Sequence, residues 1–184
     1  DVIIGDNGNA VFGSLGYLET LQSSEPSVGG GDKLVTGAGD DVVIGGALDD
    51  VIDATDGGDN RIIGDSGKLL YQTDTTSLLK VETIAPGVGG SDTIHAGDGQ
   101  DIVIGGAEAD RIELGGGNNV GLGDHGFLSW IQEEEYSENM YLNTATKISQ
   151  GGEDFISSGD AYQDLTEDPD VDGSVAYYPL DQEG

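Results

Sequence analysis

A glycine-rich turn that recurs at a fixed distance constrains the fold of this chain more than any other feature. A Gly-Asp-x-Gly turn occurs three times at intervals of 59 residues, and an aromatic residue stands four positions after each turn. Self-similarity at a fixed interval is typical of architectures in which successive units stack on one another. The turns begin at Gly5, Gly64 and Gly123, and the aromatic residues are Phe12, Tyr71 and Trp130.

A shorter period of nine residues lies inside the long units. An aspartate or asparagine recurs at this spacing, with one extra residue before Asn60, and each follows a glycine-rich turn and precedes a short apolar run. Because side chains alternate along a strand, one apolar residue of each run is expected to face a narrow core. The recurring polar residues are Asp32, Asp41, Asp50, Asn60, Asp92, Asp101, Asp110 and Asn119. The expected core residues are Leu34, Val43, Ile52, Ile62, Ile94, Val103 and Ile112.

The residue types in these turns have a physical reason. Glycine adopts positive φ and leaves room for backbone carbonyls to face an ion. Aspartate adds a hard anionic oxygen, and Ca²⁺ prefers six to eight oxygen ligands of these two kinds. The nonapeptides therefore indicate short strands joined by turns that bind a cation.

The charge of the chain supports this interpretation and excludes one class of partner. The sequence has 36 Asp and Glu against 6 Lys and Arg, a formal net charge of -30. Six scattered cations cannot form the basic patch that nucleic acids require, and insertion into a membrane is not expected. Closely packed carboxylates repel one another, so we expect cations to be part of the folded state.

The nonapeptide resembles the G-G-x-G-x-D-x-U-x repeat of RTX (repeats-in-toxin, haemolysin-type) calcium-binding proteins. The resemblance is strong over residues 1–4, 29–67 and 89–126, and it is weak over 151–165. It implies an all-β, right-handed parallel β-roll, or β-solenoid, that binds several Ca²⁺ ions between turns of successive coils. The stacked pairs that it implies are Asp32 with Asp50, Asp41 with Asn60, Asp92 with Asp110, and Asp101 with Asn119.

The candidate metal ligands are the turn acids, the turn glycines and further acids near the turns. They are Asp1, Asp6, Gly30, Asp32, Gly37, Gly39, Asp41, Gly46, Asp50, Asp59, Asn60, Asp65, Gly90, Asp92, Gly97, Gly99, Asp101, Gly106, Asp110, Asn119, Asp124, Asp154, Asp168, Asp170 and Asp172. Within this set, Asp6, Asp65 and Asp124 are substitute carboxylates in turns whose regular acidic position is apolar or small.

The nine-residue rhythm stops after each Gly-Asp-x-Gly turn. The segments 10–26, 69–86 and 127–148 are rich in Thr, Leu, Tyr and Val, and we expect each to form a β-hairpin that leaves the roll. Their apolar residues, the three recurring aromatics included, either pack inside and brace the roll or form a repeated binding surface.

The units and the C-terminal segment follow from the same pattern. We expect three long units at about 1–63, 64–122 and 123–165, the last degenerate, followed by an acidic segment at 166–184. Asp168, Asp170 and Asp172 alternate as in an EF-hand loop, but Pro179 stands where the usual glutamate would be. This segment is either a calcium loop or an acidic linker.

No constellation in the sequence indicates an enzyme. There is no cysteine, no H-E-x-x-H spacing and no G-x-S-x-G motif, and we interpret His95 and His125 as surface histidines. Adjacent carboxylates such as Asp40 and Asp41 point to opposite faces of a strand and cannot act on one substrate.

The sequence leads to one main hypothesis and two alternatives. We expect a calcium-binding structural segment of a large secreted bacterial protein that folds after export, of which this chain, beginning at Asp1 without a starter Met, is a part. The hairpins could instead form an adhesive or surface-layer module that binds a glycan or a neighbouring protein, with end-to-end self-association through open coil edges. The third hypothesis is the secretion module of an exported enzyme, of the type I secretion class.

Overall fold

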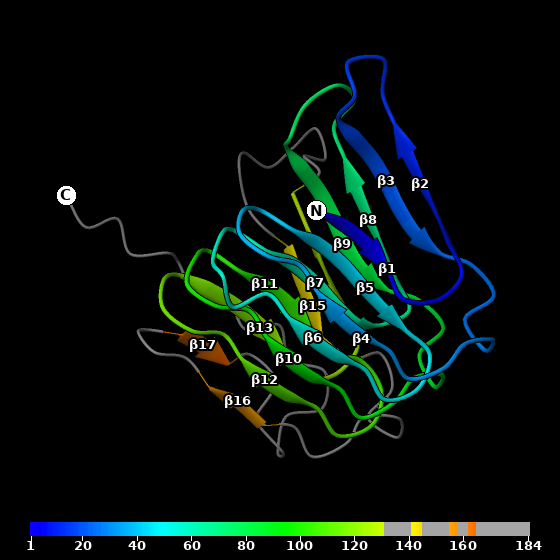
Figure 1. The fold of residues 1–184 in the computed structure, drawn as a ribbon, viewed down its shortest axis with the longest axis vertical. Coiled ribbons are helices and arrows are strands. Elements are labelled where there is room, and N and C mark those ends of the chain that lie inside the picture. The colour runs from blue at the N-terminus through cyan, green and yellow to red at the C-terminus, as the bar shows by residue number, and fades with distance from the viewer. Residues whose placement is uncertain (131–140, 145–154, 158–161, 165–184) are drawn as a thin grey trace.

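The computed structural model describes residues 1–130, 141–144, 155–157 and 162–164, the last three segments as backbone strands only. The described part is all-β and forms three sheets (Figure 1). In this part of the chain no helix is long and apolar enough to cross a membrane. The all-β class expected from the sequence is confirmed.

Two of the sheets are parallel and are visited alternately by the chain. The central sheet has the order β1 (Val2–Ile4), β5 (Val42–Gly46), β7 (Arg61–Asp65), β11 (Ile102–Ile104), β13 (Asn119–Leu122) and β17 (Tyr162–Asp164). The outer sheet has the order β4 (Lys33–Val35), β6 (Val51–Asp53), β10 (Thr93–His95), β12 (Arg111–Glu113) and β16 (Phe155–Ser157). One central and one outer strand make one coil, so strands two nonapeptides apart pair, as in Val43 with Ile62 and Ile94 with Ile112.

The third sheet is antiparallel and is built from the segments that interrupt the repeat. It contains the hairpins β2 (Gly8–Phe12) with β3 (Leu18–Ser23), β8 (Gly67–Tyr71) with β9 (Leu78–Thr83), and β14 (Gly126–Ser129) with β15 (Tyr141–Thr144). The three expected hairpins are therefore confirmed. They also pair with one another, β3 with β8 and β9 with β14, and so form one continuous hairpin sheet.

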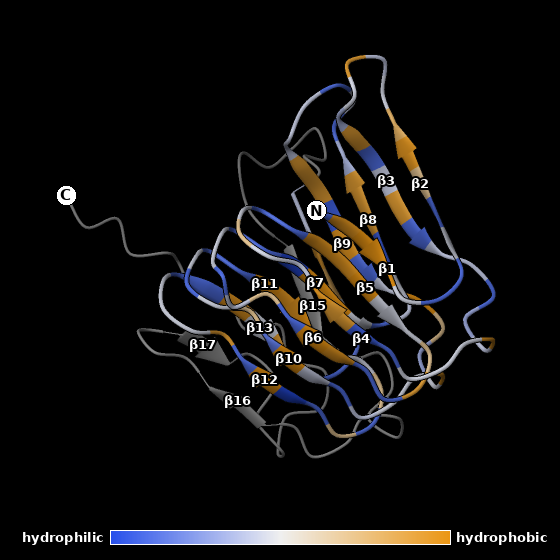
Figure 2. Ribbon diagram, viewed as in Figure 1, coloured by the Kyte–Doolittle hydropathy of each residue, from blue (hydrophilic) through white to orange (hydrophobic). Residues whose placement is uncertain are grey.

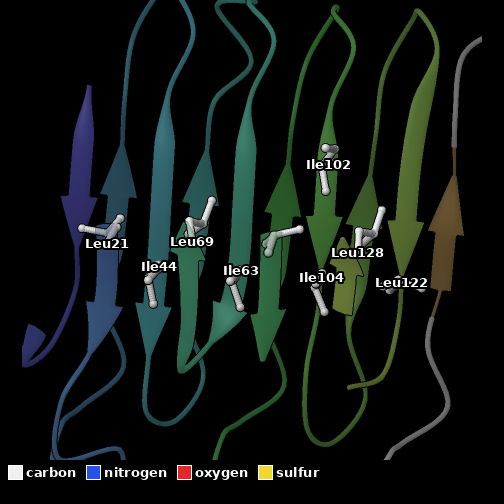
Figure 3. Packing of buried hydrophobic residues seen from close by; sticks show 9 residues of the cluster. Leu21, Ile44, Ile63, Leu69, Ile102, Ile104, Leu122 and Leu128 are labelled. Carbon is white, nitrogen blue, oxygen red and sulfur yellow. The ribbon is translucent and has the colours of Figure 1, made fainter. Parts of the chain in front are cut away.

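The central sheet is buried on both faces. On one face Val43, Ile62 and Val103 pack against Ile52, Ile94 and Ile112 of the outer sheet, which is the narrow core expected from the nonapeptides. On the other face a second core forms against the hairpin sheet (Figure 3). Its buried members are Leu21, Ile44, Ile63, Leu69, Val81, Ile102, Ile104, Leu122 and Leu128.

The strand sequences reflect this layering. Central strands carry apolar residues at successive positions, as from Val42 to Ile44, which is typical of a strand covered on both faces. Outer strands alternate, as in Thr93, Ile94 and His95, because one of their faces is in solvent. Figure 2 shows the difference between the orange β5 and the mixed β12.

The three recurring aromatics lie in two environments, the second core and the solvent-exposed surface. Tyr71 and Trp130 pack against the second core, whereas Phe12 is 52% exposed. Of the two alternatives for the aromatics, the structure shows inward packing for two of the three. Phe12 differs because β2 ends the hairpin sheet and, among the described strands, has a neighbour on one side only.

The second core predicts that the hairpins stabilise the roll. Leu69→Ala removes a fully buried side chain, and we expect it to lower the free energy of unfolding by about 3 kcal/mol because a cavity remains. Leu15→Ala is the matched control, since Leu15 is 71% exposed in the first hairpin. Urea unfolding at saturating Ca²⁺ measures both, and an equal effect of the two variants would contradict the packing of the hairpin sheet on the central sheet.

Candidate metal-binding turns

The turns between the two parallel sheets lie on two edges of the roll. The plain edge consists of the turns 36–41, 54–60, 96–101 and 114–118, which lead from an outer to a central strand. The hairpin edge consists of the connections that lead from a central to an outer strand, either by a short turn (47–50 and 105–110) or through a hairpin. Hairpins are thus inserted on one edge, in every second coil.

Each edge contains a ladder of hydrogen bonds between side chains and the backbone of the preceding coil. On the hairpin edge the N–H of Asp32 donates to Asp50 Oδ1 (2.7 Å), that of Asp50 to Asp92 Oδ1 (2.8 Å), and that of Asp92 to Asp110 Oδ1 (2.8 Å). These contacts confirm that the residues paired from the sequence on this edge stack on one another.

The plain edge repeats the same contact. The N–H of Asp41 donates to Asn60 Oδ1 (3.0 Å), that of Asn60 to Asp101 Oδ1 (2.9 Å), and that of Asp101 to Asn119 Oδ1 (2.8 Å). The N-terminal amine of Asp1 donates to Asp41 Oδ1 and so extends the ladder by one position. The stacking of Asp41 on Asn60 and of Asp101 on Asn119 is confirmed.

Within the part of the chain that the structure describes, the second carboxylate oxygen of five of these aspartates has no hydrogen-bond partner. Buried Oδ2 atoms of this kind belong to Asp32, Asp41, Asp50, Asp92 and Asp101. A buried charged oxygen without a partner costs several kcal/mol, so the ladders favour either a cation or a proton at these positions.

The acidity of the ladder residues reflects this cost. Burial raises the pKa of Asp92 to about 9, and the carboxylates of Asp65 and Asp50 add to the shift. Burial likewise raises the pKa of Asp50 to about 7 and that of Asp101 to about 6. The anionic forms of these buried groups are therefore disfavoured unless a proton or a bound cation compensates their charge.

Glycines leave the space beside the hairpin-edge oxygens. A Cβ on Gly5 would overlap Asp32 Oδ2 and the carbonyl oxygen of Gly45 in the next coil. In the same way, a Cβ on Gly45 would overlap Asp50 Oδ2 and the carbonyl oxygen of Gly64. A Cβ on Gly64 would overlap Asp92 Oδ2 and the carbonyl oxygen of Gly105. A carboxylate oxygen and a carbonyl oxygen therefore converge on one small space in successive coils.

The plain edge needs glycine for a different reason. A Cβ on Gly99 would overlap the Gly58 carbonyl, and one on Gly97 would lie 2.8 Å from the Ala54 carbonyl oxygen. Gly37, Gly39 and Gly97 have φ of 103°, 108° and 88°, the left-handed region that glycine adopts at low cost. The turns of this edge can stack this closely only without side chains.

Asp6 and Asp65 lie at the roots of the hairpins. Asp65 Oδ1 accepts the N–H of Gly90 (3.0 Å) and its Oδ2 accepts the N–H of Ala107, while Asp6 accepts those of Gly30 (3.1 Å) and Ala47 (2.7 Å) in the same way. A Cβ on Gly46 or Gly106 would overlap the Asp6 or the Asp65 carboxylate, respectively. Each carboxylate ties the end of a hairpin to the short turn of the next coil, and metal ligation by either stays a prediction.

The remaining candidates lie outside the ladders. Asp59 Oδ1 accepts the N–H of Gln100 (2.9 Å), which belongs to a second row of side chain to backbone hydrogen bonds along the plain edge. Asp124 occupies the position of Asp6 and Asp65 in the third turn. Asp154, Asp168, Asp170 and Asp172 lie outside the described residues.

The oxygen donors of the turns fit calcium better than a softer metal. Within the described residues, no group of three or more His, Asp or Glu side chains comes together to hold a metal ion. An ion in these turns would therefore take one or two carboxylate oxygens and complete its shell with backbone carbonyls. Hard oxygen ligands in this mixture suit Ca²⁺.

The sequence-based reasoning missed two features of the turns. Gly5, Gly45, Gly64 and Gly105 border the ladder carboxylates but were not among the candidates, although each stands where a central strand meets its turn. His125 was interpreted as a surface residue, and this is wrong: it is 5% exposed, and burial lowers the pKa of its ring. Its turn lies at the root of the third hairpin, where the second core begins.

Comparison with known proteins agrees with this geometry. The family model of the RTX calcium-binding nonapeptide repeat matches residues 28–60 and 86–120, in 4 copies. These segments contain both ladders from Asp32 to Asn119. No curated protein and no solved structure matches the chain.

The raised acidities predict that acid stabilises the calcium-free fold. The folded-state pKa values of Asp50, Asp92 and Asp101 lie above the ordinary value of 3.8, so their protonation favours folding at low pH. That contribution is lost as the pH rises from the ordinary value of 3.8 through the folded-state values of about 6 for Asp101, 7 for Asp50 and 9 for Asp92, and for Asp101 alone it corresponds to about 3 kcal/mol. In chelator, we expect more β-sheet circular dichroism at pH 5 than at pH 8.

Asp101→Asn separates this effect from a general change in net charge. The amide keeps an oxygen for the N–H of Asn60 and removes one titrating group. We expect the calcium-free variant to be more stable than the original chain at pH 8 and less dependent on pH. Equal pH dependence in the two proteins would show that Asp101 does not titrate in this range.

Proposed function

Because residues 28–60 and 86–120 of this chain are RTX calcium-binding nonapeptide repeats, we propose that it is a structural segment whose folding depends on Ca²⁺. The observation that carries the proposal is the row of buried Oδ2 atoms without hydrogen-bond partners in successive coils. Bound Ca²⁺ would supply the positive charge and the coordination that these oxygens lack.

The ladder residues also hold the carboxylates in the orientation in which they would bind a cation. Each Oδ1 accepts an N–H of the preceding coil and so fixes the orientation of the carboxylate. On the hairpin edge, the Oδ2 atoms of Asp50 and Asp92 are thereby directed to the spaces that Gly45 and Gly64 leave open. Without a cation, the repulsion between these buried carboxylates opposes folding. A bound cation attracts each carboxylate and offsets that repulsion.

Coupling of folding to calcium binding suits a protein that folds outside the cell. Extracellular calcium modules bind at about 10⁻⁴ to 10⁻³ M, far above the cytosolic concentration of free Ca²⁺. Binding only to the folded form converts the binding free energy into folding free energy. We therefore propose that the chain belongs to a secreted bacterial protein, stays loose before export and becomes a rigid β-roll afterwards, with the right-handed coil typical of the family.

A calcium titration tests this proposal. From chelated solution at pH 8, we expect a cooperative rise of the β-sheet circular dichroism signal with Ca²⁺ and none with equimolar Mg²⁺. Asp101→Ala should raise the calcium midpoint several-fold, because it removes a ladder oxygen. Asp56→Ala removes the same charge from an exposed position of the plain edge and should leave the midpoint unchanged. A chelator-resistant fold at pH 8 would contradict the proposal.

The first hairpin favours a second candidate function, which is association with another copy of the chain. Its exposed apolar residues include Val11, Phe12, Leu15 and Tyr17, and among the described strands β2 pairs with β3 only and ends the hairpin sheet. The equivalent strand of the second unit, β8, pairs on both sides, with β3 and β9. An open edge of this kind accepts an added strand, and the hairpin sheet already extends by this pairing inside the chain.

Charge on the edge tests the association. The double variant Val11→Lys and Phe12→Lys should shift the chain from oligomer to monomer in light scattering at saturating Ca²⁺. Val51→Lys is the control, since Val51 is 41% exposed on an internal strand of the outer sheet. A monomeric original chain at high micromolar concentration would remove this candidate and leave calcium-dependent folding intact.

A further inference from the structure

Two positions of the plain-edge ladder hold asparagine where the nonapeptide pattern has aspartate. Asn60 and Asn119 alternate there with Asp41 and Asp101, whereas the hairpin-edge ladder is aspartate at every position from Asp32 to Asp110. Both asparagines are buried, at 0% and 5% exposure. The two edges therefore differ in the number of carboxylates that they offer to a cation.

The asparagine amides bind the backbone with both of their polar atoms. Asn60 Oδ1 accepts the N–H of Asp41 (3.0 Å), and its Nδ2 donates to the carbonyl oxygen of Ala96 (2.9 Å). Asn119 Oδ1 accepts the N–H of Asp101 (2.8 Å), and its Nδ2 donates to the carbonyl oxygen of Leu114 (3.2 Å). One partner is a donor and the other an acceptor, so the chemistry fixes which way each amide points.

The neighbouring aspartates lack the second of these contacts. Asp41 and Asp101 hold the same ladder position, but their Oδ2 atoms are buried without a hydrogen-bond partner. Where aspartate presents a second anionic oxygen, asparagine presents an N–H₂ group that a carbonyl at the start of a plain-edge turn accepts. An amide nitrogen cannot coordinate Ca²⁺, and it satisfies a carbonyl that an ion would otherwise attract.

We infer that Asn60 and Asn119 close their turns without a cation, so that the plain edge takes Ca²⁺ at Asp41 and Asp101 only. This inference rests on the proposed calcium-dependent folding and adds which turns are loaded. The hairpin edge, with Asp32, Asp50 and Asp92, carries the greater calcium dependence. The asparagine turns hold their coils together by hydrogen bonds alone and keep uncompensated negative charge from accumulating at adjacent coils of the plain edge.

Conversion of the asparagines to aspartate tests the inference. Asn60→Asp and Asn119→Asp should each bind one Ca²⁺ more than the original chain in equilibrium dialysis at pH 8 and saturating Ca²⁺. Each should also raise the calcium midpoint of folding, because the calcium-free form acquires a buried carboxylate and loses an N–H donor. Asn118→Asp is the matched control: it adds the same charge at an adjacent, exposed position and should change neither quantity.

The converse substitution keeps the test decisive if an added buried charge prevents folding. Asp101→Asn should bind one Ca²⁺ fewer than the original chain and should fold at a lower Ca²⁺ concentration. Unchanged ion counts in Asp101→Asn and in every folded asparagine variant would overturn the inference. That result differs from failure of the proposed function, in which the original chain itself would bind no Ca²⁺ and its fold would not respond to chelator.

Discussion

The contact on which the rest of the structure depends is the bond between a ladder oxygen and the amide of the preceding coil. It sets the register of the parallel strands, because each ladder residue stands directly before a strand or, for Asn119, at the first position of one. It also holds one carboxylate oxygen inside the wall of the roll, without a hydrogen-bond partner. The fold thus stacks negative charge along its own edges, and this makes its stability sensitive to cations and protons.

A second constraint on the fold is that the central sheet needs an apolar cover, and the hairpin sheet supplies it. A central strand buried on both faces needs an apolar cover on the side away from the outer sheet, and a nonapeptide is too short to supply one. Hairpins inserted in every second coil provide this cover through Leu21, Leu69 and Leu128. Asp6 and Asp65 fasten the hairpin roots to the short turns of the next coil, so the insertions leave the ladder intact.

The sequence predicts much of this from the spacing of a few residue types. The apolar row from Leu34 to Ile112 and the three hairpins follow from the nine- and 59-residue periods, and the stacked pairs on both edges follow from the resemblance to RTX repeats. Pairing between hairpins was not predicted, because segments such as β3 and β8 are far apart in the chain and their contact depends on the stacking of whole units. The double-sided burial of the central sheet could have been recognised from the continuous apolar run Val42 to Ile44.

By itself the sequence determined the coil length, the inward residues and the positions of the turn acids, since these depend on local backbone geometry and strand alternation. Only the tertiary structure decided which atoms of those acids have partners. Asp101 and Asn119 look equivalent in the repeat, yet one leaves an oxygen unsatisfied and the other binds a carbonyl. The residue type decides that an amide N–H₂ can donate to a carbonyl and that a carboxylate oxygen cannot, but only the fold brings the Leu114 carbonyl within reach of Asn119 Nδ2.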